Sequence, residues 1–66
     1  FQYDEYKIRQ NGKCSIVSIN YSGEVTTLIP ANYLDIYFQN GVIVAQTECY
    51  DDIYNKNFKK IYSTKS

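Results

Sequence analysis

The sequence predicts a small, mainly β domain, built as an antiparallel five-stranded sheet or a small barrel and followed by a short C-terminal helix. Two observations carry this prediction. An Asn-Gly pair, the strongest short-range signal for a two-residue hairpin turn, occurs at Asn11-Gly12 and again at Asn40-Gly41. Each pair lies between runs of alternating apolar and polar residues, which is typical of strands with one face on a core. The 66 residues suffice for one small domain, which we expect to span 1–66.

The first hairpin is predicted to pair residues 3–10 with residues 13–21. Counting outward from the turn places opposed side chains on the same face of the sheet. One face then collects the apolar residues Tyr6, Ile8, Val17 and Ile19. The other face mixes Glu5, Lys7 and Arg9 with Cys14, Ile16 and Ser18. We expect the apolar face to lie on the core and the mixed face to be largely wet.

A third strand is predicted over residues 24–29, which are rich in β-branched Val and Thr. Pro30 is expected to end it, because proline has no N–H to donate to a neighbouring strand. The segment 30–33 should then form a tight turn or a single turn of 3₁₀ helix.

The second hairpin is predicted to pair residues 34–39 with residues 42–50. Its register places Leu34, Ile36, Phe38, Ile43 and Ala45 on the dry face. The opposite face carries an apolar and aromatic strip beside a carboxylate, formed by Tyr33, Tyr37, Val42, Val44 and Asp35.

The tail after Asp51 is predicted to form a short helix. Its apolar residues follow helical spacing, with acidic residues at the expected start and lysines at the expected end. These apolar residues are Tyr54, Phe58, Ile61 and Tyr62. The alternative is a third hairpin turning at residues 55–57, because the helix would be short and contains poor helix formers. A helical tail could cover the tyrosine strip with Phe58 and Ile61.

The segments 12–19 and 28–34, with Gly23 between them, resemble the C-terminal half of an SH3 domain. In that family a strand opens with Gly and a charged residue, and the sequence closes on Ile-Pro-x-Asn-Tyr through a 3₁₀ turn. Tyr3-Asp4-x-Tyr6 is similar to the Tyr-Asp-Tyr near the start of the family. The resemblance implies a small barrel that binds an extended peptide, with Tyr33 in the peptide groove.

The chain departs from the SH3 pattern in three respects. Cys14 and Ser15 stand where the family has a pair of Trp residues. SH3 domains have a long acidic loop between their first strands, and this chain has no room for one. A whole hairpin and tail also follow at the point where an SH3 domain ends. Tyr33 is therefore carried over to the groove by its position in Pro-x-Asn-Tyr alone.

Catalysis is not indicated, because the chain has no His and therefore lacks the commonest general base. Asp51 and Asp52 are neighbours, so their carboxylates diverge rather than converge on a substrate. The two cysteines have no CxxC spacing, which leaves too few ligands for a zinc site. We therefore expect no enzyme, metal or cofactor, and the sequence leaves open both a Cys14–Cys49 disulfide and two free thiols.

Function is expected to rest on tyrosine, of which the chain has eight. Tyrosine offers rigid, amphipathic contact area, and interfaces are enriched in it. We predict a non-catalytic protein-binding module or small inhibitor that uses a tyrosine-rich sheet face or an exposed strand edge. Its anchors would be Tyr33, Tyr37, Val42 and Val44, with Asp35 beside them.

Two alternatives stay open. The first is a single-stranded nucleic-acid binder using Lys7, Arg9 and Lys13, although the net charge of zero counts against it. The second is a structural subunit or homodimer that buries the strip against a copy of itself. No apolar run approaches the roughly 20 residues that span a bilayer, so we expect a soluble protein that does not contact membranes.

Overall fold

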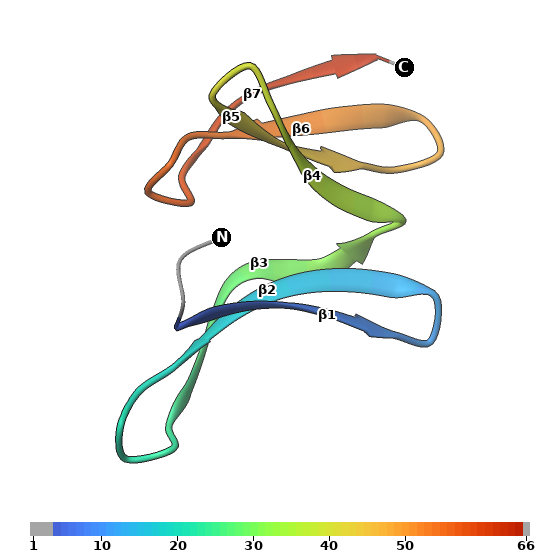
Figure 1. Cartoon of the computed structure of the whole chain (residues 1–66). Coiled ribbons are helices and arrows are strands. Elements are labelled where there is room, and N and C mark those ends of the chain that lie inside the picture. Colours follow the sequence, from blue (N-terminus) through green and yellow to red (C-terminus); the bar gives the residue numbers. More distant parts are fainter. Residues whose placement is uncertain (1–3, 66) are drawn as a thin grey trace.

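The computed structural model describes residues 4–65, and within that range it has seven strands and no helix. The strands form two antiparallel sheets, one lying over the other (Figure 1). Sheet A has the order β1-β2-β3, with β1 (Glu5–Gln10), β2 (Lys13–Ile19) and β3 (Val25–Tyr33). Sheet B has the order β4-β5-β6-β7, with β4 (Asp35–Gln39), β5 (Val42–Gln46), β6 (Tyr50–Tyr54) and β7 (Lys60–Lys65).

The mainly β class is confirmed, whereas the single five-stranded sheet and the C-terminal helix are wrong. The tail instead forms β6 and β7, the third hairpin that the sequence left as an alternative. Tyr54 and Phe58 therefore belong to a strand and a turn, and their helical spacing is coincidental. Pairing with β5 supplies β6 with a ladder of hydrogen bonds that the isolated sequence does not reveal.

Both Asn-Gly turns and the register around them are confirmed. Asn11 and Asn40 have φ of 52° and 53°, and the glycines after them also have positive φ, as a type I′ turn requires. Tyr6 pairs with Val17 and Phe38 with Ile43, as counted outward from the turns. Residue 3, the predicted start of the first strand, lies outside the described residues.

Pro30 does not end the third strand, because β3 continues through it to Tyr33. The ladder is interrupted at this point: Cys14 of β2 pairs with Tyr33, while Ile16 pairs with Ile29. Between these pairs β2 has one residue, Ser15, and β3 has three, so Pro30 lies in a bulge of an edge strand, where its missing N–H breaks no regular pair. The predicted turn over 30–33 is therefore wrong.

Leu34 forms the corner at which the chain passes from sheet A to sheet B. Its N–H donates to the carbonyl of Gln46 in β5 at 2.7 Å. Its own carbonyl accepts from the guanidinium of Arg9 at 3.1 Å and from the thiol of Cys14 at 3.5 Å. One residue is thereby bonded to both sheets, which fixes their relative position.

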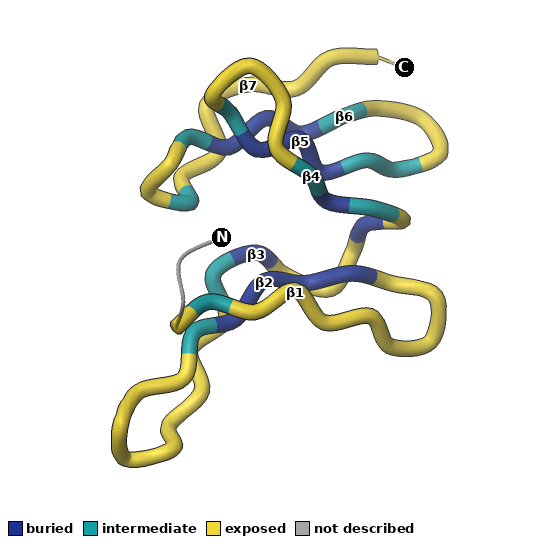
Figure 2. The backbone as a smooth tube through the Cα atoms, in the orientation of Figure 1, coloured by how far each residue is buried: buried dark blue, intermediate teal, exposed yellow. Residues whose placement is uncertain are grey.

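The core lies between the sheets (Figure 2). Sheet A contributes Cys14, Ile16, Ile29 and Tyr33, and sheet B contributes Ile36, Ile43, Ala45 and Tyr54. The face predicted for the core is therefore right in the second hairpin and wrong in the first. Tyr6, Ile8 and Ile19 point away from sheet B and are 48%, 39% and 38% exposed. Register fixes which residues share a face, but the second sheet decides which face is covered.

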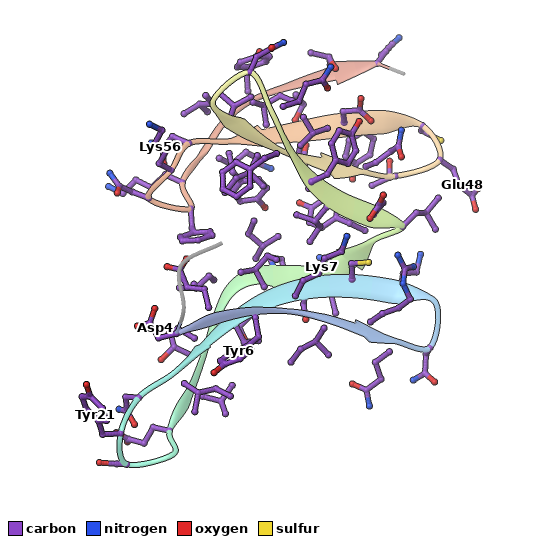
Figure 3. The ribbon with its side chains drawn as sticks, viewed as in Figure 1. Asp4, Tyr6, Lys7, Tyr21, Glu48 and Lys56 are labelled. Atoms are coloured by element: carbon purple, nitrogen blue, oxygen red, sulfur yellow. The ribbon has the colours of Figure 1, made fainter. Side chains whose placement is uncertain are left out.

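The mixed face of the first hairpin can turn inward because its charged residues lie on the edge strand β1. Lys7 extends from that edge to Asp35 of β4, with 2.8 Å between Nζ and Oδ1 (Figure 3). Arg9 follows the same route, at 3.7 Å from the same oxygen. The charges thus reach the rim of the sandwich, while Cys14 and Ile16 of the central strand fill its interior.

Candidate functional site

The side of sheet B that faces away from sheet A carries a continuous apolar row. Side chains alternate along each strand, so the residues next in sequence to inward Ile36, Ala45 and Tyr54 point outward. The register joins Tyr37 to Val44, Val44 to Ile53 and Ile53 to Tyr62. We call the outward residues the outer face: Asp35, Tyr37, Gln39, Val42, Val44, Gln46, Asp51, Ile53, Tyr62 and Thr64.

The centre of this row is shielded from water although it lies on an outward surface. Val44 and Ile53 are only 5% and 6% exposed, while Tyr62 at the end of the row is 54% exposed. A pocket of about 380 Å³ lies beside it, lined by Gln39, Asn40, Val42, Val44, Ile53 and Tyr62. The row therefore combines a solvent-shielded aliphatic centre with an exposed aromatic ring and an adjacent pocket.

Four of the five predicted anchors lie on this face. Tyr37, Val42 and Val44 are neighbours in β4 and β5, and Asp35 begins β4. Tyr33 is not among them: it lies in the core and is 4% exposed. Its placement was misjudged because alternation does not carry across the corner at Leu34, where the chain changes sheets.

Ile53 and Tyr62 were missed because the tail was expected to be helical. The strand signal here is weak, because Asp51, Asp52, Ile53 and Tyr54 do not alternate between apolar and polar. The tail also does not cover the strip. Phe58 packs against the core, and Ile61 is 48% exposed. β7 pairs beside β6 as a further strand of sheet B and does not lie over its face.

Next to the apolar row lies a polar row, in which Asp35 pairs with Gln46, Gln46 with Asp51 and Asp51 with Thr64. The Asp35 carboxylate accepts from Lys7 and from the N–H of Ile36. The hydrogen bond from Lys7, with the charges of Lys7 and Arg9, holds the pKa of Asp35 below its usual range despite some burial. Asp51 differs, because its Oδ1 is buried and none of residues 4–65 donates to it.

The three cations considered for nucleic-acid binding do not form one open strip. Lys7 and Arg9 are both engaged by Asp35 at the junction of the sheets. Lys13 is exposed and pairs with Gln10 at the end of the first hairpin. Two of the three cations therefore already share an ion-pair partner within the chain.

A buried polar cluster joins the two sheets. The Tyr33 hydroxyl donates to Asp52 Oδ2 at 2.7 Å and lies 2.8 Å from the Tyr54 hydroxyl. Ser63 donates to the other Asp52 oxygen, and Lys60 Nζ lies 3.9 Å from Oδ2. Burial and these hydrogen bonds raise the pKa of Tyr33, so its hydroxyl stays protonated. Burial opposes ionisation of Asp52, but donation from Ser63 and Tyr33 and the charge of Lys60 outweigh it and lower its pKa.

This cluster is structural in character, since it is enclosed and each group already has a partner. Within residues 4–65 no three His, Cys, Asp or Glu side chains come together as a metal site. Cys14 is buried and Cys49 exposed, and both are free thiols. The same range holds no helix long and apolar enough to cross a membrane.

Sheet A also presents apolar residues outward, around a pocket of about 300 Å³. Asp4, Tyr6, Ile19, Asn20 and Tyr21 line this pocket. Tyr6 points away from sheet B, and Tyr21 projects from the tip of the β2–β3 loop, where it is fully exposed (Figure 3). No residue predicted for partner binding lies here.

Comparisons of the chain with protein-family models, with curated proteins and with solved structures found no match.

Proposed function

We propose that this chain is a non-catalytic protein-binding module whose contact surface is the outer face of sheet B. The observation that carries the proposal is the row of Tyr37, Val44, Ile53 and Tyr62, which crosses every strand of the sheet and is left uncovered by the rest of the described chain. The row takes no part in the packing between the two sheets, because the core is formed on the other side of sheet B.

The chemistry of the row is that of a binding centre. Val44 and Ile53 are only 5% and 6% exposed, so the apolar area that a partner newly covers comes mainly from Tyr62, which is 54% exposed. Tyrosine side chains lose only two torsions when they become fixed, and they combine apolar contact with a hydroxyl. The pocket beside Tyr62 lies at the lower end of the range of about 300–1,000 Å³ that ligand pockets occupy. A partner could therefore place one anchoring side chain in it.

An exposed strand edge adjoins the row. Among residues 4–65, β7 pairs only with β6, and each of its six residues is exposed. An extended partner segment can add a strand to such an edge through backbone hydrogen bonds. A partner lying over Tyr62 would reach this edge without crossing another element.

Selection of random short peptides displayed on phage, followed by amide chemical-shift mapping of the bound peptide, tests the proposal. We expect selected peptides to perturb amides of β5, β6 and β7. Tyr62→Ala should weaken binding by at least about tenfold with little loss of stability, since half of this side chain is already exposed. Tyr37→Ala should likewise weaken binding more than it lowers stability.

Tyr21→Ala is the matched control, because it removes a fully exposed tyrosine from the β2–β3 loop, away from sheet B. It should leave peptide binding unchanged. Failure to select any peptide, shifts confined to sheet A, or equal losses for Tyr21→Ala and Tyr62→Ala would contradict the proposal. A molecular mass that rises with concentration, with shifts on the same face, would indicate self-association instead.

A further inference from the structure

The structure also points to the chemistry of the partner, an inference that rests on the function proposed above. We infer that the outer face of sheet B selects an extended peptide carrying an Arg or Lys, which donates to the Asp51 carboxylate, and an apolar residue two positions away, which enters the pocket beside Tyr62.

The first step is the unsatisfied carboxylate. Asp51 lies in β6, two residues before Ile53 of the apolar row, and its Oδ1 is buried without a donor from residues 4–65. A shielded, charged oxygen with no hydrogen bond destabilises the protein. The other carboxylate oxygen, Oδ2, is not enclosed in this way, so it is the atom that a donor arriving from outside reaches.

The second step is the comparison with the other aspartates in the strands of sheet B. Asp35 accepts from Lys7 and from the N–H of Ile36. Asp52 accepts from Tyr33 and Ser63. The fold thus supplies donors to both of these carboxylates, while Asp51 Oδ1 has none in the described chain.

The third step is charge. The outer face, as defined by its ten residues, contains two carboxylates and no Lys or Arg. Lys60 of the neighbouring strand lies on the inner side, 3.9 Å from Asp52. A cation for Asp51 must therefore come from a partner, and a cationic partner is complementary to this face.

The fourth step is spacing. Residues two apart on one strand point to the same face and lie about 6.6–6.8 Å apart. Asp51 and Ile53 have this relation, and Ile53 lines the pocket. An extended peptide running along β6 repeats the same spacing, so its residues i and i+2 match the carboxylate and the pocket.

The probes are the peptides selected on the unmodified protein, synthesised with their own sequence and with citrulline replacing Arg or norleucine replacing Lys. Selected peptides should pair a basic residue with an apolar residue at i and i+2. Removal of the charge should weaken binding to the unmodified protein by at least about tenfold. Asp51→Asn should abolish this difference between charged and uncharged probes, and Asp51→Thr should do so as well.

Glu48→Gln is the control, because it removes an exposed carboxylate at the β5–β6 turn, outside the outer face (Figure 3). It should leave discrimination between the probes intact. Peptides that bind the outer face without a basic residue, or whose preference for charge survives Asp51→Asn, would overturn the inference and leave the proposed function standing. Failure to select any peptide would overturn both.

Discussion

Replacement of Tyr33 by Phe should destabilise the protein by about 2–3 kcal/mol. The ring keeps its place in the core, so the loss is confined to the hydroxyl. Asp52, which is 4% exposed, loses a charge-assisted hydrogen bond of 2.7 Å, and Tyr54 loses its 2.8 Å partner. A hydrogen bond to a charged group contributes about 1.5–3 kcal/mol and a neutral one about 1 kcal/mol. The two losses share one hydroxyl, so they add incompletely.

This loss is a large part of the total, since a 66-residue chain at about 0.05–0.15 kcal/mol per residue has roughly 3–10 kcal/mol of stability. Urea unfolding followed by circular dichroism measures it. Tyr54→Phe is the control, because it removes the neutral contact and leaves the bond from Tyr33 to Asp52 in place. It should cost only about 1 kcal/mol.

The pH dependence of the same variant tests the role of charge. Because the folded protein holds the pKa of Asp52 below the unfolded value, Asp52 adds stability above the unfolded pKa and loses it as pH falls through the folded pKa. The difference between the unmodified protein and Tyr33→Phe should therefore be greatest near neutral pH and shrink in acid. A loss equal to that of Tyr54→Phe, or unchanged across this range, would refute the reasoning.

Three further predictions concern single side chains. Asp51→Thr should raise the free energy of unfolding by about 1 kcal/mol, since it removes the unsatisfied oxygen and places Thr opposite Thr64; urea unfolding that shows a loss would contradict this. Phe58 has φ of 64°, which only Gly adopts freely, so Phe58→Gly should unfold at a free energy about 1 kcal/mol higher than Phe58→Ala; the reverse order would argue against strain at this turn. Cys49 should react with a thiol reagent in the folded protein, whereas Cys14, which is fully buried, should react only as the protein unfolds; equal rates would indicate an open core.

The β2–β3 and β6–β7 loops show why the tail was difficult to assign from sequence. In each loop an Asn side chain accepts from two later N–H groups: Asn20 from Ser22 and Glu24, Asn55 from Asn57 and Lys59. In the first loop the residue with positive φ is Gly23, and a glycine there is a recognisable turn signal. The second places Phe58 there, and a bulky residue at that position hides the turn.

Tyr33 and Asp52 illustrate a second limit. Each looks like a surface residue in its own segment: Tyr33 lies three residues after a proline, and Asp52 lies beside a second aspartate. Their hydrogen bond joins β3 to β6, so it exists only when the two sheets are stacked. The outer face was found in part, because Tyr37, Val42 and Val44 belong to one hairpin, whereas Ile53 and Tyr62 required knowledge of how β6 and β7 pair.

The sequence by itself determined the two Asn-Gly turns, the register that follows from them and, within each of these two hairpins, the sets of residues that share a face. Those features depend on backbone conformation at two residues and on alternation along a strand, which are local properties. Only the tertiary structure decided that Cys14 and Ile16 face inward, that Pro30 lies in a bulge and that Asp51 is left without a donor. These outcomes depend on which surface the second sheet covers, and that choice is made by contacts between segments far apart in the chain.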